Sequence, residues 1–217
     1  MGIKLTEPFH FNETTGWTLN KIHGGNWFGK TVVIGGQTWM AENLNVTHYR
    51  DGSPIQNEVV GSAWGNDTEG AYGVYGDDPF SNLVCGKLYN WHAVNNIRGL
   101  APYGWHIPTD DEWTTLEDYL DSSEDGSMLA GRRELWDSGD LENNSEFGTS
   151  GFNGLPAGYR NASNGNYLNM GNLGYFWSSS ETTSTHAWTR RLSYNNSYVY
   201  RSYHSKRYGF SIRCIKD

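Results

Sequence analysis

The sequence predicts one loop-rich α+β domain, and its length, its composition and two helix signals support this prediction. The chain has 217 residues, which fits one large domain, or one domain with an arm, at roughly 100–200 residues per domain. Aromatic residues make up 15%, hydrophobic residues only 36%, and there are 27 glycines. Short aromatic runs between Gly, Asn and Ser are typical of many turns and few long helices. Composition alone fits an α+β or a mostly-β domain, and the two helices expected below favour α+β.

The first third of the chain is predicted to hold an arm, a hairpin and a long polar segment. Residues 1–29 are expected to form an N-terminal arm that packs on the main domain, residues 30–217, through Phe9, Phe11, Trp17 and Trp27. A hairpin is predicted with strands at 31–34 and 37–40, because two glycines between β-rich runs are a tight-turn signal. The polar stretch 51–83 is too long for a plain loop and is expected to be functional or partly structured.

The middle of the chain carries the helix signals. Residues 87–94 alternate in polarity and predict a strand. Thr109 and Glu112 have the spacing of a capping box, and acidic residues favour a helix N-terminus, so a helix begins there. Trp113, Leu116 and Leu120 fall on one face of it. A second, shorter helix is expected over 127–136, with short strands and turns after about residue 145.

Charge and hydropathy limit the classes of partner. The chain carries a net charge of −8, but residues 187–217 hold seven basic residues and one acidic residue. This basic end either attracts acidic ligands or pairs internally with the acidic remainder, and we prefer internal pairing. The pI near 5.3 argues against nucleic acid as the main partner. No apolar run approaches the ~18 residues of a membrane span, and no secretion signal is expected in this form.

Six segments follow one another along the chain: TVVIGGQTWMAENL (31–44), GKLYNWHAV (86–94), GWHIPTDDEW (104–113), SGFNGLPAGYR (150–160), YFWSSS (175–180) and YGFSIRCIKD (208–217). In this order they resemble the Fibrobacter succinogenes major paralogous domain family. The resemblance implies a C-type lectin fold and a relation to formylglycine-generating-enzyme domains. Many members have a cysteine just before the GWH motif, where this chain has Ala101, Pro102 and Tyr103. A bridge between Cys85 and Cys214 is therefore unsupported, and the alternatives are one disulfide in an exported protein or two buried thiols.

Motifs for catalysis and metal binding are missing from the sequence. There is no GxSxG, no P-loop and no GxGxxG, and no two of the seven histidines have zinc-motif spacing. Formylglycine-generating enzymes use cysteines ahead of the final strand, and residues 190–208 contain none. His106 is expected to be a hydrogen-bonded structural residue. We therefore predict no enzymatic activity, with an oxidase of the formylglycine-generating type as the alternative that these absences oppose.

No cofactor is predicted. Residues 121–126 imitate the start of an EF-hand loop, but the twelfth position is Arg132 rather than a glutamate, so we interpret them as a solvated turn. The EPN, QPD and WND motifs of calcium-dependent sugar-binding lectins are absent. A structural calcium in segment 51–83 or 137–146 is left open.

A binding surface is predicted in residues 159–208, which hold eight of the chain's 14 tyrosines among many Asn and Ser residues. Tyr gives large contact area at low entropy cost, and Ser and Asn give adaptable hydrogen bonds, as in antibody paratopes. The alternative is an ordinary aromatic β surface, and Trp177, Phe210 and Ile212 are expected to be core. The candidate ligand-binding residues are Tyr159, Asn161, Ser163, Asn166, Tyr167, Trp188, Arg190, Tyr194, Asn196, Tyr198, Tyr200, Ser202, Tyr203 and His204.

The predicted function is ligand recognition without catalysis. Asn, Tyr, Ser, His, Arg, Gly and Asp are among the residues that can be reached when the adenines of AAC or AAT codons vary. Such variation occurs in the variable proteins of diversity-generating retroelements, which this chain resembles. The expected partner is a protein or cell-surface ligand, with a carbohydrate-binding module of a surface protein as the alternative. The missing signal favours a cytosolic or virion-borne protein, whereas the family favours a cell surface or extracellular location, so location stays open.

Overall fold

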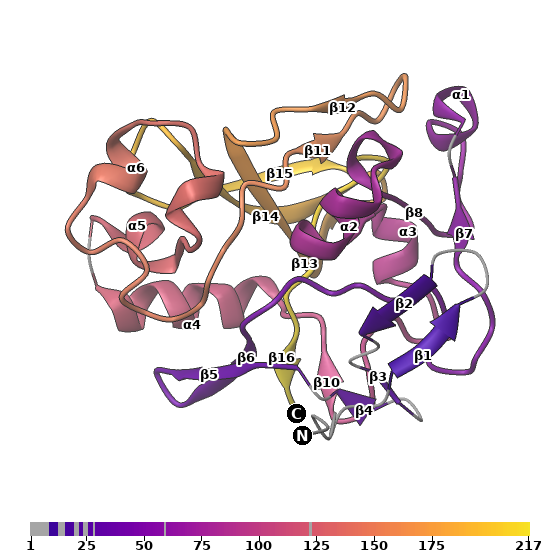
Figure 1. The fold of residues 1–217 in the computed structure, drawn as a ribbon, viewed down its shortest axis with the longest axis horizontal. Helices are drawn as coiled ribbons and strands as arrows, with labels where there is room; N and C mark the ends of the chain where they lie inside the picture. The colour runs from indigo at the N-terminus through magenta and orange to yellow at the C-terminus, as the bar shows by residue number, and fades with distance from the viewer. Residues whose placement is uncertain are drawn as a thin grey trace, which may run out of the picture.

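A computed structural model describes residues 29–58, 60–121 and 123–217, together with the backbone of four short strands before them. Strand β1 (Phe9–Asn12) pairs with β2 (Gly16–Leu19), and β3 (Ile22–His23) pairs with β4 (Asn26–Trp27). The predicted packing of the N-terminal aromatic side chains lies outside the described residues. From residue 29 onward the chain mixes helices with several small sheets, which confirms the α+β class (Figure 1).

A four-stranded sheet joins the start of the domain to its end. Its order is β10 (Trp105–His106), β16 (Ile215–Lys216), β6 (Gln37–Met40) and β5 (Thr31–Ile34). The predicted hairpin is confirmed, because β5 and β6 pair around Gly35 and Gly36, whose φ angles are 58° and 82°. Positive φ at both turn residues matches the right-handed twist of the strands.

The polar segment 51–83 is partly structured, as predicted. It contains β7 (Gln56–Asn57), α1 (Gly61–Trp64), β8 (Ala71–Gly73), the 3₁₀ helix η1 (Tyr75–Asp77) and most of α2 (Pro79–Cys85). Strand β8 lies between β7, which is parallel to it, and the antiparallel β9 (Leu88–Tyr89).

The strand predicted over 87–94 is wrong after Tyr89. Asn90 ends it, because its side chain accepts a hydrogen bond from the Ala93 N–H and thereby caps the helix α3 (Trp91–Val94). The same amide oxygen accepts from the Ala71 N–H at 3.0 Å. A local cap joined to a long-range contact outweighs the alternating pattern.

Helix α4 (Asp110–Leu120) begins where the capping box predicts. The Thr109 hydroxyl accepts from the Glu112 N–H at 3.2 Å, and the Glu112 carboxylate accepts from the Thr109 N–H at 2.8 Å. Trp113 and Leu116 are buried on its inner face.

The second predicted helix, over 127–136, is shorter and starts earlier. Helix α5 (Asp125–Leu129) is followed by the 3₁₀ helix η2 (Arg133–Leu135) and α6 (Asp140–Asn143). The break has two visible causes: Ala130 forms a β-bridge with Gly154, and Arg132 has a φ of 56°. A left-handed residue cannot continue a right-handed helix.

The C-terminal half builds the sheet that carries most of the candidate site. Strands β13 (Leu173–Thr183), β14 (His186–Ser193) and β15 (Tyr200–Ser205) are antiparallel, and among the described residues β15 pairs with β14 alone. The hairpin of β11 (Tyr159–Arg160) and β12 (Tyr167–Leu168) lies beside it, toward the top of Figure 1.

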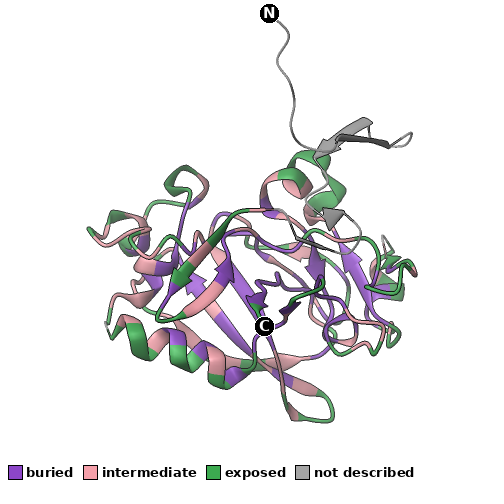
Figure 2. Ribbon diagram, turned by 90° about the horizontal axis from the view of Figure 1, so that it is seen from below, coloured by how far each residue is buried: buried purple, intermediate pink, exposed green. Residues whose placement is uncertain are grey.

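Two clusters of buried side chains pack on the two faces of this sheet, and Figure 2 shows the buried residues, in purple, gathered in the interior of the fold. Tyr175 and Trp177 belong to one cluster, and Phe176 to the other. Trp177, Phe210 and Ile212 are 0–1% exposed, which confirms them as core. No described helix has the length and apolar character needed to cross a membrane.

Candidate functional site

The pairing of β14 with β15 decides which candidate residues share a face of the sheet. The pairs Arg191 with Tyr200, Thr189 with Ser202 and Ala187 with His204 alternate with Arg190 opposite Arg201 and Trp188 opposite Tyr203. Side chains alternate between the faces of a strand. The first set therefore lies on the face of Tyr175 and Trp177, and the second on the face covered by α4.

The first face carries a group of side chains that are mostly aromatic, which we call the tyrosine band. Its members are Tyr159, Tyr198, Tyr200, Ser202, His204 and Tyr208. The Tyr208 ring contacts the rings of Tyr159 and His204, with centroids 5.9 and 5.6 Å apart. Phe210 lies under them, stacked on Tyr175 at 4.5 Å and on Tyr208 at 5.5 Å, both at 11°. A bridge between Arg160 and Gly209 adds a backbone link. The β11 segment and strand β15, distant in sequence, thus share one supported surface.

One end of the tyrosine band is a small polar network around Tyr200. The hydroxyls of Tyr198 and Tyr200 are 2.7 Å apart, and Asn196 Nδ2 donates to the Tyr200 hydroxyl at 2.9 Å. The Arg191 guanidinium lies 3.9 Å from the centroid of the Tyr200 ring. Arg191 was not among the residues predicted from sequence. Arg190 precedes Arg191 in the chain, and the strand register shows that their side chains lie on opposite faces of the sheet.

The prediction that Arg190 binds ligand needs correction, because this side chain is only 1% exposed. Its Nη1 pairs with Asp110 at 2.6 Å, and its Nε pairs with Glu117. Nη2 of Arg201 also pairs with Asp110, 2.6 Å from its Oδ2. With Lys206 paired to Glu181, these contacts favour the internal pairing expected for the basic end.

Trp188 and Tyr203 lie on the opposite face from the tyrosine band. The guanidinium of Arg201 covers the Trp188 ring at 3.5 Å, whereas Tyr203 is 60% exposed and touches Trp188 edge-on at 5.9 Å. Tyr194 is half-buried against the second core cluster, and its carbonyl accepts from the Leu141 N–H. Tyr203 can therefore meet a ligand from this face, while Tyr194 anchors the chain.

The remaining candidates form the turn between β11 and β12. The Asn161 Oδ1 accepts from the N–H and hydroxyl of Ser163, at 2.9 and 2.7 Å, and Asn166 is exposed. Tyr167 points away from Tyr159, because it pairs across the hairpin with Arg160. Its ring packs on Tyr75 with centroids 5.4 Å apart, and burial raises the pKa of the Tyr167 hydroxyl far above its ordinary value. This turn is a separate group from the tyrosine band.

The titratable groups near the tyrosine band are poorly suited to acid–base catalysis. Burial, followed by the charges of Arg191 and His186, lowers the pKa of His204 to about 4, so its ring is neutral at pH 7. Cys85 and Cys214 are free and buried, and burial raises their pKa values to about 11 and about 12. The two-thiol alternative is therefore the one in the structure, and both thiols are protonated at neutral pH.

His106 has the structural role predicted for it. Its Nδ1 lies 2.8 Å from Asp217 and its Nε2 lies 2.7 Å from Glu112, so it links the C-terminus to helix α4. Within the described ranges, no group of three or more His, Cys, Asp or Glu side chains is arranged to hold a metal ion.

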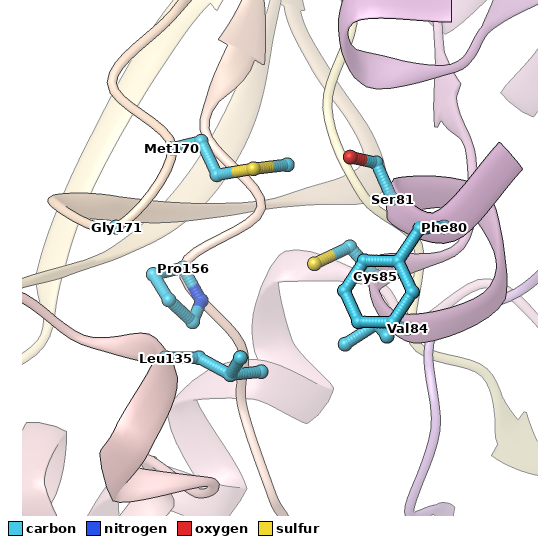
Figure 3. Close-up of a pocket in the computed structure, with 8 residues that line it drawn as sticks. All are labelled: Phe80, Ser81, Val84, Cys85, Leu135, Pro156, Met170 and Gly171. Carbon is cyan, nitrogen blue, oxygen red and sulfur yellow. The ribbon is translucent and has the colours of Figure 1, made fainter. Parts of the chain in front are cut away.

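An apolar pocket lies between α2 and the loop before β13 (Figure 3). Phe80 and Val84 line one side, and Pro156 and Met170 the other, with the Cys85 thiol between them. Its volume of about 160 Å³ is below the roughly 300–1,000 Å³ of typical small-molecule sites. Among the described residues that line it, Cys85 alone is titratable, and its thiol is protonated, so these residues offer no acid–base pair.

Comparisons with known proteins give one match. Neither the curated proteins nor the solved structures contain a match to this chain. The family model of the Fibrobacter succinogenes major domain matches residues 32–216, which include every strand of the tyrosine band and its supporting core. The chain therefore belongs to the Fibrobacter succinogenes major domain family.

Proposed function

We propose that this protein is a non-enzymatic binding module that recognises a protein or cell-surface ligand through the tyrosine band. The observation that carries the proposal is the placement of Tyr200, Ser202 and His204 on one face of β15, an edge strand of the sheet in the described part of the chain, with the Tyr198 hydroxyl beside that of Tyr200. All six residues of β15 are exposed or half-buried. Rigid aromatic side chains on a fixed scaffold lose little entropy on binding.

The support beneath the tyrosine band favours recognition over catalysis. The stack of Tyr175, Phe210 and Tyr208 holds the surface rings in place. The one imidazole among them, that of His204, has its pKa lowered to about 4 by burial and by neighbouring cations. A general acid–base catalyst works best with a pKa near the operating pH, so this histidine suits a packing role.

The test replaces Tyr198, which is 45% exposed, by alanine. Labelled protein is first screened against whole cells and purified surface proteins, and Tyr198→Ala is then compared on the ligand found. Loss of an exposed aromatic anchor costs about 2 kcal/mol, so affinity falls about 30-fold while Tm stays within about 1 °C of the wild-type value. Tyr103→Ala is the matched control, since Tyr103 is 52% exposed and lies outside the tyrosine band. Equal losses in both variants contradict the proposal.

We further propose that the fold is related to the C-type lectin fold and that residues 159–208 are diversified by a retroelement. The support for diversification is the composition of β15, whose residues Tyr, Arg, Ser, Tyr, His and Ser can all arise from variation of adenines in AAC or AAT codons. Amplicon sequencing of the locus across its natural population is the test. Substitutions clustered at adenines of codons 159–208 support diversification, and an even, mostly silent spread contradicts it.

A second candidate function is carbohydrate binding, which the Tyr203 ring favours because it is 60% exposed and a sugar ring can stack on it. A glycan array probed with and without a chelator tests this candidate. Chelator-resistant binding that Tyr203→Ala removes supports it, and an array without signal rejects it.

A further inference from the structure

Among the described residues, no side chain partners the charge of Arg191. Its guanidinium forms no hydrogen bond or ion pair within the described part of the chain, and its Nε is buried without an acceptor. Buried polar groups in folded proteins are nearly always paired. The neighbouring cations follow that rule: Arg190, Arg201 and Lys206 each bind a carboxylate. The exception at Arg191 therefore needs an explanation.

The structure also fixes where this guanidinium lies. It stacks on the Tyr200 ring at 3.9 Å, and the Tyr175 ring is 5.9 Å away. Tyr200 is itself held by hydrogen bonds to Asn196 and Tyr198. Among the Arg191 nitrogens, Nε is the buried one, so Nη1 and Nη2 retain access to solvent. A guanidinium is planar and carries its N–H groups in a rigid fork that matches a carboxylate, so a position over the Tyr200 ring leaves this edge available to a ligand.

No described carboxylate competes for this edge. Asp110 and Glu117 lie on the opposite face of the sheet, bound to Arg190 and Arg201. Asp125, near the loop after β14, accepts from the N–H groups of Gly126 and Val199. A chain of net charge −8 thus displays an uncompensated cation at the end of the tyrosine band.

We propose that Arg191 binds the carboxylate of an Asp or Glu side chain of the protein ligand, through Nη1 and Nη2. This inference rests on the proposed function, since it assigns an acidic group to the ligand of the tyrosine band. Charge complementarity selects the carboxylate, and bidentate arginine–carboxylate hydrogen bonds are roughly twice as strong as neutral ones. A protein is the favoured source because the guanidinium sits on an open strand surface among Tyr, Ser and Asn, the residues of paratopes.

The test selects ligands without assuming their identity. A display library of random disulfide-closed peptides is panned separately on the wild type, on Arg191→Gln and on Arg207→Gln. Arg207 is an exposed arginine whose Nη1 donates to the Gly65 carbonyl, which makes it the matched control. We expect Asp and Glu to be enriched about twofold or more by the wild type and by Arg207→Gln, and to return to library frequency with Arg191→Gln, because pairing to a fixed arginine drives the selection.

A quantitative arm uses one acidic peptide from the wild-type selection. Arg191→Gln, or replacement of the peptide's acidic residue by its amide, weakens binding about tenfold or more, and the two changes together weaken it little further. Arg191→Lys keeps the charge without the planar fork and recovers part of the affinity. Near-ultraviolet circular dichroism and Tm must match the wild type, so that lost folding is not read as lost binding.

The outcomes separate this inference from the proposed function. Peptides that need Tyr198 but show no Arg191-dependent enrichment of Asp and Glu overturn the inference and leave the binding function standing. A wild type that selects no peptide overturns the binding function and the inference with it. Arg191-dependent binding of carboxylated glycans, without acidic peptides, overturns the choice of a protein as the source.

Discussion

Replacing Arg190 by methionine tests the claim that this arginine is a structural residue. The guanidinium pairs with Asp110 at 2.6 Å and with Glu117, and its Nη2 lies 3.2 Å from the Thr114 hydroxyl. Methionine removes these contacts but keeps most of the volume. Two carboxylates then lose a cation that was 1% exposed. Because they are left on the buried side of α4, we expect a loss of stability.

The size of that loss follows from what each carboxylate keeps. Breaking a buried ion pair by removing one partner costs about 3–5 kcal/mol. Asp110 keeps its contact with Arg201 at 2.6 Å, and Glu117 can take up a proton, since burial already raises its pKa despite the nearby Arg190. The lower end of the range, about 3 kcal/mol, is therefore expected, and at about 2–4 °C per kcal/mol it lowers Tm by about 6–12 °C.

Urea unfolding followed by tryptophan fluorescence measures this loss, with calorimetry for Tm. Arg201→Met is the control: its side chain is 45% exposed, so it should cost about 1 kcal/mol or less. Adding Glu117→Gln to Arg190→Met removes the orphaned charge and should recover about 1 kcal/mol. A loss below about 1 kcal/mol for Arg190→Met, or equal losses for the two arginine variants, would refute the reasoning.

Two further predictions concern protonation. Burial tends to lower the pKa of His106, but the hydrogen bonds to Asp217 and Glu112 outweigh it and raise the pKa. A raised folded-state pKa gives stability that is complete below the unfolded value of about 6.5 and is lost as pH rises through the folded value. The Tm difference between wild type and His106→Gln should therefore be larger at pH 5.5 than at pH 8.5, and a difference independent of pH contradicts the ion-pair interpretation. Cys214 is 0% exposed and its pKa is raised to about 12 by burial, so a thiol reagent should label it only after unfolding. Rapid labelling of native Cys214, found by peptide mass mapping, contradicts its placement in the core.

The sequence was sufficient where a signal lies within a few adjacent residues. The Thr109–Glu112 capping box and the Gly35–Gly36 turn satisfy their own backbone groups, so the helix begins and the hairpin turns where predicted. The break after α5 could not be predicted in the same way. It depends on the bridge between Ala130 and Gly154, which are far apart in the chain.

The candidate site shows the same division. Its location within residues 159–208 followed from composition, but its faces did not. Arg190 and Arg191 are identical neighbours in sequence, and only the β14–β15 register turns one toward Asp110 and the other toward Tyr200. Tyr159 and Tyr167 were both predicted to bind ligand, but the register of the β11–β12 hairpin places their side chains on opposite faces.

The free edge of β15 has a practical consequence for protein engineering. Positions 198, 202 and 203 are exposed or half-buried and take no part in the two main core clusters. Arg201, which precedes Ser202, forms an ion pair with Asp110. A combinatorial library that varies Tyr198 and Ser202 on the tyrosine band and Tyr203 on the opposite face, while retaining Arg201, would therefore change both surfaces without touching the framework. The chain could then serve as a compact, disulfide-independent alternative to an antibody fragment.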